Sequence, residues 1–253
     1  MKIGLAGQAA AQTLAFVGAR IEAGVTTAQI DAWVRDDTRK RRGRPSQLGY
    51  NGFPAAVCTS VNHVVCHGIP GPLVLRDGDI VNVDITTELD GFHGDTSRTF
   101  EIGTPSAAAR HLVRTCQRAL EAGIAAVRPG AQLGDIGHAI QTLAHRAGCS
   151  VVTDYAGHGI GRQMHEAPNI PHHGRPGTGL VLRPGMTFTI EPMLNLGRSD
   201  VRHLDDGWTV VTADGSLSAQ FEHTLHVTRN GAEILTDLGP KHHLLDAQAR
   251  HWG

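Results

Sequence analysis

The sequence predicts an α+β fold made of two similar halves. Two segments with helical periodicity precede a segment of short strands and turns, and the same order then recurs. Residues 75–84 resemble residues 182–191, which follow 107 positions later, and residues 21–30 resemble residues 127–136 at a spacing of 106. Because two separate matches share nearly one spacing, we expect a single domain over residues 1–253, with the strands of both halves joined in one sheet.

The first half, at about residues 10–105, begins with two predicted helices at residues 8–20 and 28–42. A glycine and a pair of threonines separate these helices. The basic run of residues 39–44 (RKRRGR) is expected to be the solvated end of the second helix, where cations suit the helix dipole. Residues 49–100 hold short apolar runs between glycine and aspartate turns, a pattern typical of strands and hairpins.

The second half, at about residues 106–235, repeats this order. Helices are predicted at residues 106–127 and 133–147, and a glycine follows the apolar pattern of each. Strands and loops are predicted over residues 151–228. Residues 238–253 form a variable tail that matches no motif.

Composition excludes several classes of protein. The 23 basic and 24 acidic residues leave a net charge of -1, which argues against binding to DNA, because that requires a clustered positive surplus. No stretch approaches the ~18 consecutive apolar residues of a membrane span, so we expect no membrane partner. The four cysteines form no C-x-x-C pair and are expected to be reduced thiols of a cytoplasmic protein.

A pair of acidic residues recurs in both halves. Asp84 and Glu191 occupy the same place in the repeated segment, and each alternates with apolar residues as on the polar face of a strand. Asp95 follows Asp84 across a glycine turn, and Glu222 alternates with apolar neighbours in residues 221–225 (FEHTL) of the second half. We expect a hairpin with two inward-facing acids in each half. Four converging carboxylates repel one another unless cations hold them together.

A histidine completes this predicted cluster. His158 lies between glycines in residues 157–161 (GHGIG), which let the backbone approach closely and aim the imidazole. His67 lies in a similar segment of the first half, residues 66–70 (CHGIP). Four carboxylates and one imidazole suit two close ions of manganese, iron, cobalt or zinc, which clamp and activate a water molecule. The residues themselves therefore predict a dinuclear metallohydrolase and leave its substrate open.

The same segments resemble the type I methionine aminopeptidases, which belong to peptidase family M24 and have the pita-bread fold. The matching segments are residues 61–70 (VNHVVCHGIP), 77–84 (DGDIVNVD), 91–96 (GFHGDT), 157–162 (GHGIGR), 184–192 (PGMTFTIEP) and 216–223 (SLSAQFEH). The resemblance implies two pseudo-symmetric α/β halves around a central, mainly antiparallel sheet that helices cover.

The resemblance also implies which residues act. Two divalent ions would be bound by Asp84, Asp95, His158, Glu191 and Glu222. Of these ligands, Asp95 and Glu222 would bridge both ions, and Glu191 would pass the proton of the attacking water to the leaving amine. His67 would contact the substrate amide. His165 would donate a hydrogen bond to the scissile carbonyl and to the oxyanion that develops there.

A pocket for the methionine side chain is implied as well. Its predicted lining, beside His67 and His165, is Tyr50, Phe53, Cys58, Met164 and Trp208, an aromatic and sulfur surface suited to a thioether. Two positions depart from the family pattern. Met164 stands where bacterial relatives often carry an aromatic residue, and Gln47 replaces a cysteine seen in some relatives.

The implied activity is removal of the N-terminal methionine from nascent proteins and short peptides with a small second residue. The attacking group would be a water or hydroxide that bridges the two metal ions. We expect a cytoplasmic monomer that associates transiently with the ribosome.

Three alternatives stay open. A proline-specific peptidase of the same fold usually carries an N-terminal domain, for which 253 residues leave no room. A non-catalytic relative that binds peptides or protein partners should have damaged ligands, and a histidine-rich metal buffer would need no ordered His67 and His165.

Overall fold

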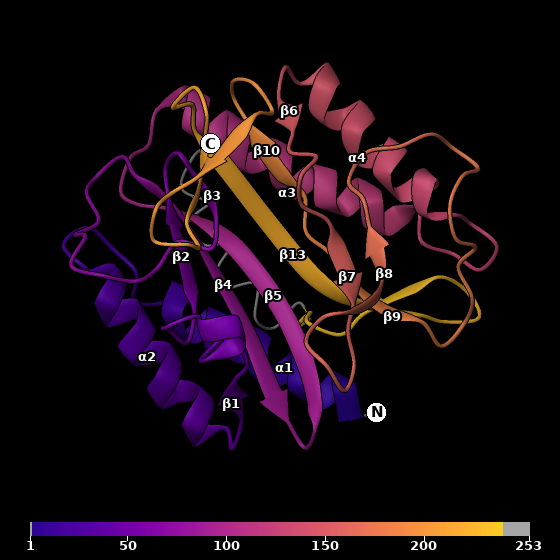
Figure 1. The fold of residues 1–253 in the computed structure, drawn as a ribbon, viewed down its shortest axis with the longest axis horizontal. Helices are drawn as coiled ribbons and strands as arrows, with labels where there is room; N and C mark the ends of the chain where they lie inside the picture. Colours follow the sequence, from indigo (N-terminus) through magenta and orange to yellow (C-terminus); the bar gives the residue numbers. More distant parts are fainter. Residues whose placement is uncertain (1, 240–253) are drawn as a thin grey trace.

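A computed structural model describes residues 2–239 (Figure 1). Helices, strands, helices and strands follow one another along the chain, so the predicted order is confirmed. The helices are α1 (Lys2–Gly18), α2 (Thr27–Lys40), α3 (Ala107–Ala125), α4 (Leu133–Arg146) and the short 3-10 helix η1 (Tyr50–Gly52). The predicted tail lies outside the described residues from position 240 onward.

The strands form one large sheet and one small sheet. Those of the first half are β1 (Arg44–Pro45), β2 (Cys58–Val61), β3 (Val64–Cys66), β4 (Ile80–Leu89) and β5 (Phe92–Glu101). Those of the second half are β6 (Ser150–Val151), β7 (Gly157–Gly159), β8 (Glu166–Ile170), β9 (Thr187–Ile190), β10 (Met193–Asn195), β11 (Val201–His203), β12 (Val210–Thr212), β13 (Ser218–Val227) and β14 (Ala232–Ile234).

The large sheet has eleven strands, and its main path is β1-β4-β5-β13-β9-β7-β8. The neighbours β5 and β13 join the two halves near the middle of this path (Figure 1). The small sheet has the order β11-β12-β3. Within residues 2–239 the strand pairs are antiparallel, so the predicted central antiparallel sheet is confirmed.

Helices cover one face of the sheet and leave the other face to polar side chains. Leu14 of α1 and Ile30 of α2 pack with Val83 of β4, and Leu112 of α3 packs in the same core as Phe188 of β9. Burying each such side chain contributes roughly 1.5–3 kcal/mol relative to exposure. Because side chains alternate along a strand, the neighbours of these apolar residues point to the opposite face of the sheet.

The first helix begins earlier than predicted, at Lys2 instead of residue 8. Gly4 and Gly7 interrupt the apolar pattern of this segment, and the structure shows what glycine does there. A Cβ atom at Gly7 would lie 2.7 Å from the main-chain oxygen of Leu235, and a Cβ atom at Gly94 of β5 would lie 2.3 Å from the nitrogen of Gly7. These glycines therefore let α1 pack directly against the sheet.

The second pair of acids does not lie on a hairpin, contrary to the prediction. Strands β9 and β13 are antiparallel neighbours, but residues 191–217 lie between them in the chain. This excursion contains β10, which pairs with β13 and β6, and the β11–β12 ribbon, which pairs with β3 of the first half. Sheet pairing over long sequence separations leaves no local pattern of the kind that marks a hairpin turn.

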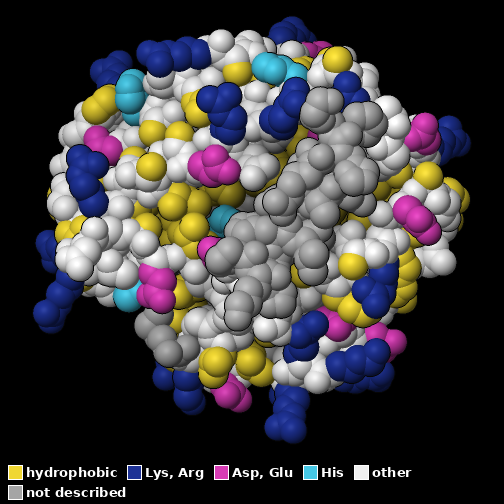
Figure 2. Space-filling model, turned by 180° about the vertical axis from the view of Figure 1, so that it is seen from behind, with side chains coloured by type: hydrophobic (Ala, Val, Ile, Leu, Met, Phe, Trp, Pro, Cys, Tyr) yellow, Lys and Arg dark blue, Asp and Glu magenta, His cyan; other side chains and the backbone are white. Residues whose placement is uncertain are grey.

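The basic run of residues 39–44 ends α2, as predicted. Arg39 pairs with Asp36 at 2.9 Å, and Arg41 pairs with Asp37 at 2.6 Å, both along the helix. On the face opposite to Figure 1, Lys and Arg side chains are spread among Asp and Glu side chains (Figure 2). In the part of the chain that the structure describes, none of the helices is long and apolar enough to span a membrane.

Candidate active site

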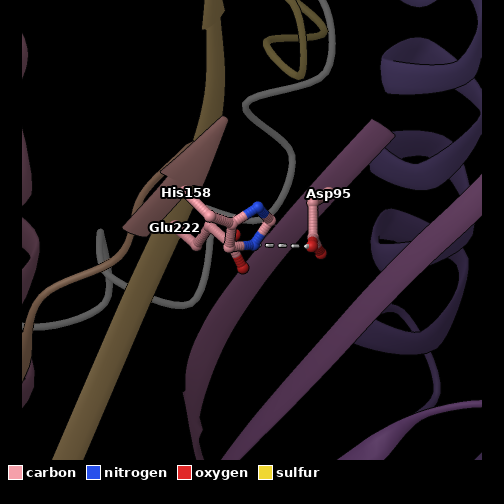
Figure 3. Close-up of side chains that lie close together, drawn as sticks. All are labelled: Asp95, His158 and Glu222. Atoms are coloured by element: carbon pink, nitrogen blue, oxygen red, sulfur yellow. Dashed lines mark ion pairs between the residues drawn. The ribbon is translucent and has the colours of Figure 1, made fainter. Parts of the chain in front are cut away.

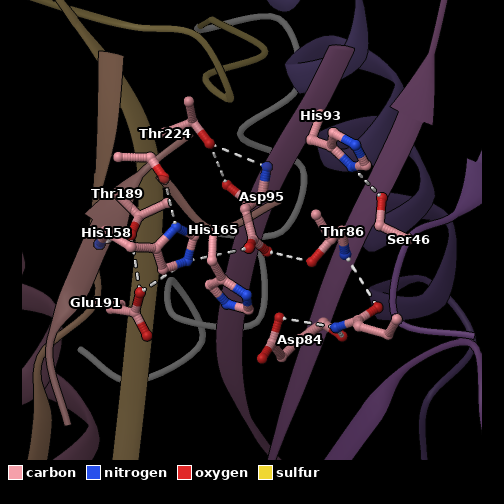
Figure 4. A network of polar contacts seen from close by, with 12 residues as sticks. Ser46, Asp84, Thr86, His93, Asp95, His158, His165, Thr189, Glu191 and Thr224 are labelled. Atoms are coloured by element: carbon pink, nitrogen blue, oxygen red, sulfur yellow. Dashed lines mark hydrogen bonds and ion pairs between the residues drawn. The ribbon is translucent and has the colours of Figure 1, made fainter. Parts of the chain in front are cut away.

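The predicted metal ligands lie on, or directly after, five neighbouring strands. In sheet order, the residues are Asp84 on β4, Asp95 on β5, Glu222 on β13, Glu191 at the end of β9 and His158 on β7. Figures 3 and 4 show these side chains pointing toward one another from the same face of the sheet. Residues far apart in the chain thus meet because their strands are neighbours.

The distances within this group are short. Oxygen or nitrogen atoms of Asp95, His158 and Glu222 lie within 4.8 Å of one another (Figure 3). The Nε2 atom of His158 is 3.7 Å from an oxygen of Asp95 and 3.5 Å from an oxygen of Glu191. Strand register explains the central contact, because Glu222 pairs with Ser97 and therefore lies diagonally across from Asp95.

The electrostatics of this group disfavour four ionised acids without a cation. Burial raises the pKa of Asp84, of Asp95 and of Glu222 above the ordinary range, and neighbouring carboxylates add to the shift of Asp84 and Glu222. Burial, helped by Asp95, raises the pKa of Glu191 to about 8. Glu222 is 2% exposed, and its buried Oε1 atom has no hydrogen-bond partner among the described residues. An orphaned carboxylate oxygen in a group of acids and a histidine fits a divalent cation.

Glycine permits the close packing around His158, as the sequence predicted. A Cβ atom at Gly157 would lie 2.4 Å from the main-chain oxygen of Thr189, and one at Gly159 would lie 2.2 Å from that of Ala167. The main-chain nitrogen of His158 donates to the Thr189 hydroxyl at 3.0 Å. The strand therefore lies tightly against its neighbours, and this packing fixes where the imidazole points.

Several residues that support the acids were missed from sequence. Thr86 donates its hydroxyl to Asp95 at 2.8 Å, and Thr189 donates to Glu191 at 2.8 Å (Figure 4). His172 is fully buried, and its Nε2 atom accepts the main-chain N–H of Glu191 at 3.1 Å. Thr86 lies two positions after Asp84 on β4, and Thr189 of β9 lies two positions before Glu191, a spacing that places both side chains on one face of an extended chain. Nothing in the local sequence distinguishes His172 among sixteen histidines.

His165 lies directly beside the acid cluster. Its ring centroid is 4.2 Å from that of His158, and its Nδ1 atom is 2.8 Å from the hydroxyl of Tyr50. Partial burial, with His158 nearby, lowers the pKa of His165 to about 4, so its imidazole is neutral at pH 7. If the Tyr50 hydroxyl donates to Nδ1, the ring proton is on Nε2, which is then free to donate to a substrate.

His67 lines the same cavity as the acids and His165. Its backbone φ angle is 56°, a left-handed conformation that is uncommon outside glycine. The next residue, Gly68, packs so closely that a Cβ atom would lie 2.2 Å from the oxygen of Thr59. The ring stands edge-on to Tyr155 and to Trp208. Burial lowers the pKa of His67 to about 4, so this imidazole is neutral as well.

One cavity of about 970 Å³ contains every predicted site residue. In its apolar wall, the ring centroids of Phe53 and Trp208 are 5.1 Å apart in a T-shaped contact. Cys58 belongs to the same hydrophobic cluster. Met164 is buried and also lines the cavity. The long excursion after β9 explains this wall, because it brings Trp208 back to the first half. Tyr155 and Met193 also line the cavity and were missed from sequence.

Comparisons with known proteins agree with this geometry. The model of metallopeptidase family M24 matches residues 2–229. Methionine aminopeptidase A of Synechocystis is 52% identical over 236 residues, which cover 93% of this chain and 93% of that protein. The crystal structure of methionine aminopeptidase from Rickettsia prowazekii superposes with a TM-score of 0.92 at 49% identity, covering 93% of this chain and 96% of that one.

The solved structure of a prolidase is less similar. Prolidase from Pyrococcus furiosus superposes with a TM-score of 0.72 at 21% identity, and the match covers 93% of this chain but 63% of the prolidase chain. A likeness of this degree shows the shared fold alone. By sequence and by structure, the chain belongs to metallopeptidase family M24, where it groups with the methionine aminopeptidases.

Proposed function

We propose that this metal-dependent aminopeptidase removes the N-terminal methionine from polypeptides with a small second residue. The observation that carries the proposal is the arrangement of the cavity. Acids from neighbouring strands and His158 form one part of its lining. Phe53, Cys58 and Trp208 form an aromatic and sulfur surface in another part of the lining. A free amine and scissile bond would lie over the acids while the methionine side chain enters the apolar wall. The similarity to methionine aminopeptidases supports the same activity.

The acid cluster would hold two divalent ions. Asp95 and Glu222, from the two central strands, would hold these ions together with Asp84, His158 and Glu191. When bound, such ions activate water and polarise the carbonyl under attack. The donor set suits cobalt, manganese, iron or zinc.

Side chains of the protein would transfer the proton, bind the scissile carbonyl and enclose the substrate. Glu191 would accept the proton of the attacking water and deliver it to the leaving amine. His165 would donate a hydrogen bond to the carbonyl oxygen as negative charge develops on it, while Tyr50 holds the ring in place. His67 would contact the amide of the substrate beside Trp208. Tyr50, Phe53, Cys58, Met164 and Trp208 would enclose the methionine side chain.

A peptide panel tests this function. We expect methionine release from Met-Ala-Ser and Met-Gly peptides and at least ~100-fold lower kcat/KM for Met-Leu and Met-Phe peptides, because a bulky second side chain must fit beside the acids and His67. Release of the first residue from Leu-Ala-Ser should be similarly slow. The free amino acid is measured by mass spectrometry with and without Mn²⁺.

The same panel separates the alternatives. Preference for Met-Pro over Met-Ala would indicate a proline-specific peptidase. Efficient release of leucine, or equal rates for every second residue, would indicate a general aminopeptidase. Peptide binding without cleavage at saturating metal would indicate a non-catalytic relative.

We further propose that the enzyme acts as a cytoplasmic monomer on nascent chains, with transient ribosome association. The buried free thiols of all four cysteines suit that compartment.

Metal removal should make stability depend on pH between 6.5 and 8. In the metal-free folded state Glu191 has a pKa of about 8, while the unfolded chain releases this proton near 4.5. Below 4.5 both states are protonated, and above it the folded state keeps a proton that the unfolded state has lost. The free energy of unfolding must therefore fall as the pH rises toward 8. Histidines with lowered pKa values oppose this trend only below about 6.5.

Thermal melting checks this prediction. With a chelator, the midpoint should be lower at pH 8 than at pH 6.5, and Mn²⁺ should raise the midpoint more at pH 8, because its ligands must be deprotonated. A metal-free midpoint that stays constant or rises between pH 6.5 and pH 8 would show that the acids of the cluster are already ionised at pH 6.5.

A further inference from the structure

Gln47 places a buried amide against the Asp84 side of the acid cluster. It is 7% exposed, lies just after β1 and lines the cavity. Its Nε2 atom donates to the main-chain oxygen of Asp84 at 2.9 Å and to the carboxylate of the same residue at 3.3 Å. Its Oε1 atom accepts the main-chain N–H of Thr86 at 3.2 Å. Both ends of the amide are therefore used, and turning it over would set its NH₂ group against the N–H of Thr86.

The position of Gln47 on the sheet explains why an amide fits there. The outer edge of β4 is paired with β1 at positions 87–88 and with β2 at positions 81–84. Along this outer edge, none of the strands within residues 2–239 pairs with positions 85–86, where the main-chain N–H of Ser46 donates to the oxygen of Thr86 at 2.9 Å. A side-chain amide carries the same donor and acceptor as a peptide group, so Gln47 pairs with β4 in that gap and continues its hydrogen bonding.

These contacts reach both acids of the first hairpin. Gln47 touches the Asp84 carboxylate itself. It also holds the backbone of Thr86, whose hydroxyl donates to Asp95 at 2.8 Å (Figure 4). Thr86 pairs directly with Asp95 across the β4–β5 hairpin. The amide adds no charge to a cluster in which burial and nearby acids already raise the pKa of Asp84.

We propose that Gln47 is a positioning residue for metal binding, which fixes the Asp84 carboxylate and, through Thr86, the hydrogen bond to Asp95. This inference rests on the proposed function, because it takes both acids as ligands. A residue that orients a metal ligand typically contributes 10–100-fold in metal affinity. A purely structural amide at the edge of β4 would contribute to the stability of the metal-free protein and would leave metal affinity unchanged.

The test compares Mn²⁺ binding by metal-free Gln47→Met, Gln117→Leu and unaltered protein, measured by isothermal titration calorimetry. Methionine matches glutamine in length and lacks its donors and acceptor. Gln117 is an exposed glutamine of α3 bonded to Glu121, so its variant serves as the control. We expect Gln47→Met to weaken one Mn²⁺ site by ~10–100-fold and Gln117→Leu to bind like the unaltered protein.

The visible spectrum of the Co²⁺-loaded protein gives a second measurement, because it reports ligand geometry and should change in Gln47→Met only. If Gln47→Met does not fold, Gln47→Asn retains the amide on a stem one methylene shorter and should weaken Mn²⁺ in the same direction. Unchanged affinity and an unchanged Co²⁺ spectrum in a folded variant would overturn the inference. Failure of the unaltered protein to bind Mn²⁺ at all would instead overturn the proposed function.

Discussion

Asp95→Asn and Glu222→Gln should each abolish methionine release. Both acids lie on the two central strands, and both are within 4.8 Å of the same imidazole, that of His158. Each substitution preserves the shape of the side chain and removes a carboxylate from the proposed ligands of the two ions. The loss should exceed the ~10–100-fold that removal of a residue supporting a ligand causes. Measurements of kcat/KM on Met-Ala-Ser and of bound metal by elemental analysis check this result.

The same two variants should be more stable than the unaltered protein when metal is absent. Burial and neighbouring carboxylates raise the pKa of Glu222, which means that its ionised form is unfavourable in the folded state. A neutral amide removes that penalty, so the thermal midpoint measured with a chelator should rise. Asp200→Asn, which changes an exposed acid of the excursion after β9, is the control and should alter neither quantity. Wild-type turnover by folded Asp95→Asn would refute the proposed ligand set.

The buried acids lower the stability of the metal-free protein but suit metal binding. This contrast explains why the sequence could predict them. Paired acids that recur in both halves do not stabilise the fold, because they repel one another. Their repetition therefore indicated a bound cation. The sequence also predicted that Asp84 and Asp95 lie close together, because they are on consecutive strands of a tight hairpin. The structure places the predicted residues in one cavity. Their roles as ligands stay predictions that the two variants test.

Features that depend on distant pairing could not be predicted. Glu191 and Glu222 are neighbours because β9 pairs with β13 after a long excursion, and no turn signal marks that pairing. Gln47 acts through a gap at the edge of β4, which exists only once β1 and β2 have docked. His172 reaches the N–H of Glu191 from a separate loop. For Gln47 and His172 the sequence shows an ordinary polar residue, and its role arises from tertiary contacts. For Glu191 and Glu222 the sequence indicated inward-facing acids but did not show that their strands pair.

His165→Ala should lower kcat by ~10²–10³-fold while metal content stays normal, because removal of one oxyanion donor typically has an effect of this size. The side chain lies beside the acids but is held by Tyr50 at 2.8 Å, and its pKa of about 4 keeps it neutral throughout the pH range of the assay. Its loss should therefore scale kcat by a constant factor between pH 6 and pH 8. Single-turnover kinetics and elemental analysis of the same preparation measure the two quantities.

The partner of His165 supplies the matched control. Tyr50→Phe keeps the aromatic wall and removes only the hydroxyl at Nδ1, so kcat should fall less than in His165→Ala. Because Tyr50 would act by fixing the ring, combining both substitutions should cost no more than His165→Ala alone. Additive losses would mean that the hydroxyl of Tyr50 contacts the substrate directly. Loss of metal from folded His165→Ala would make His165 a ligand, and the assignment of His158 would then have to be revised.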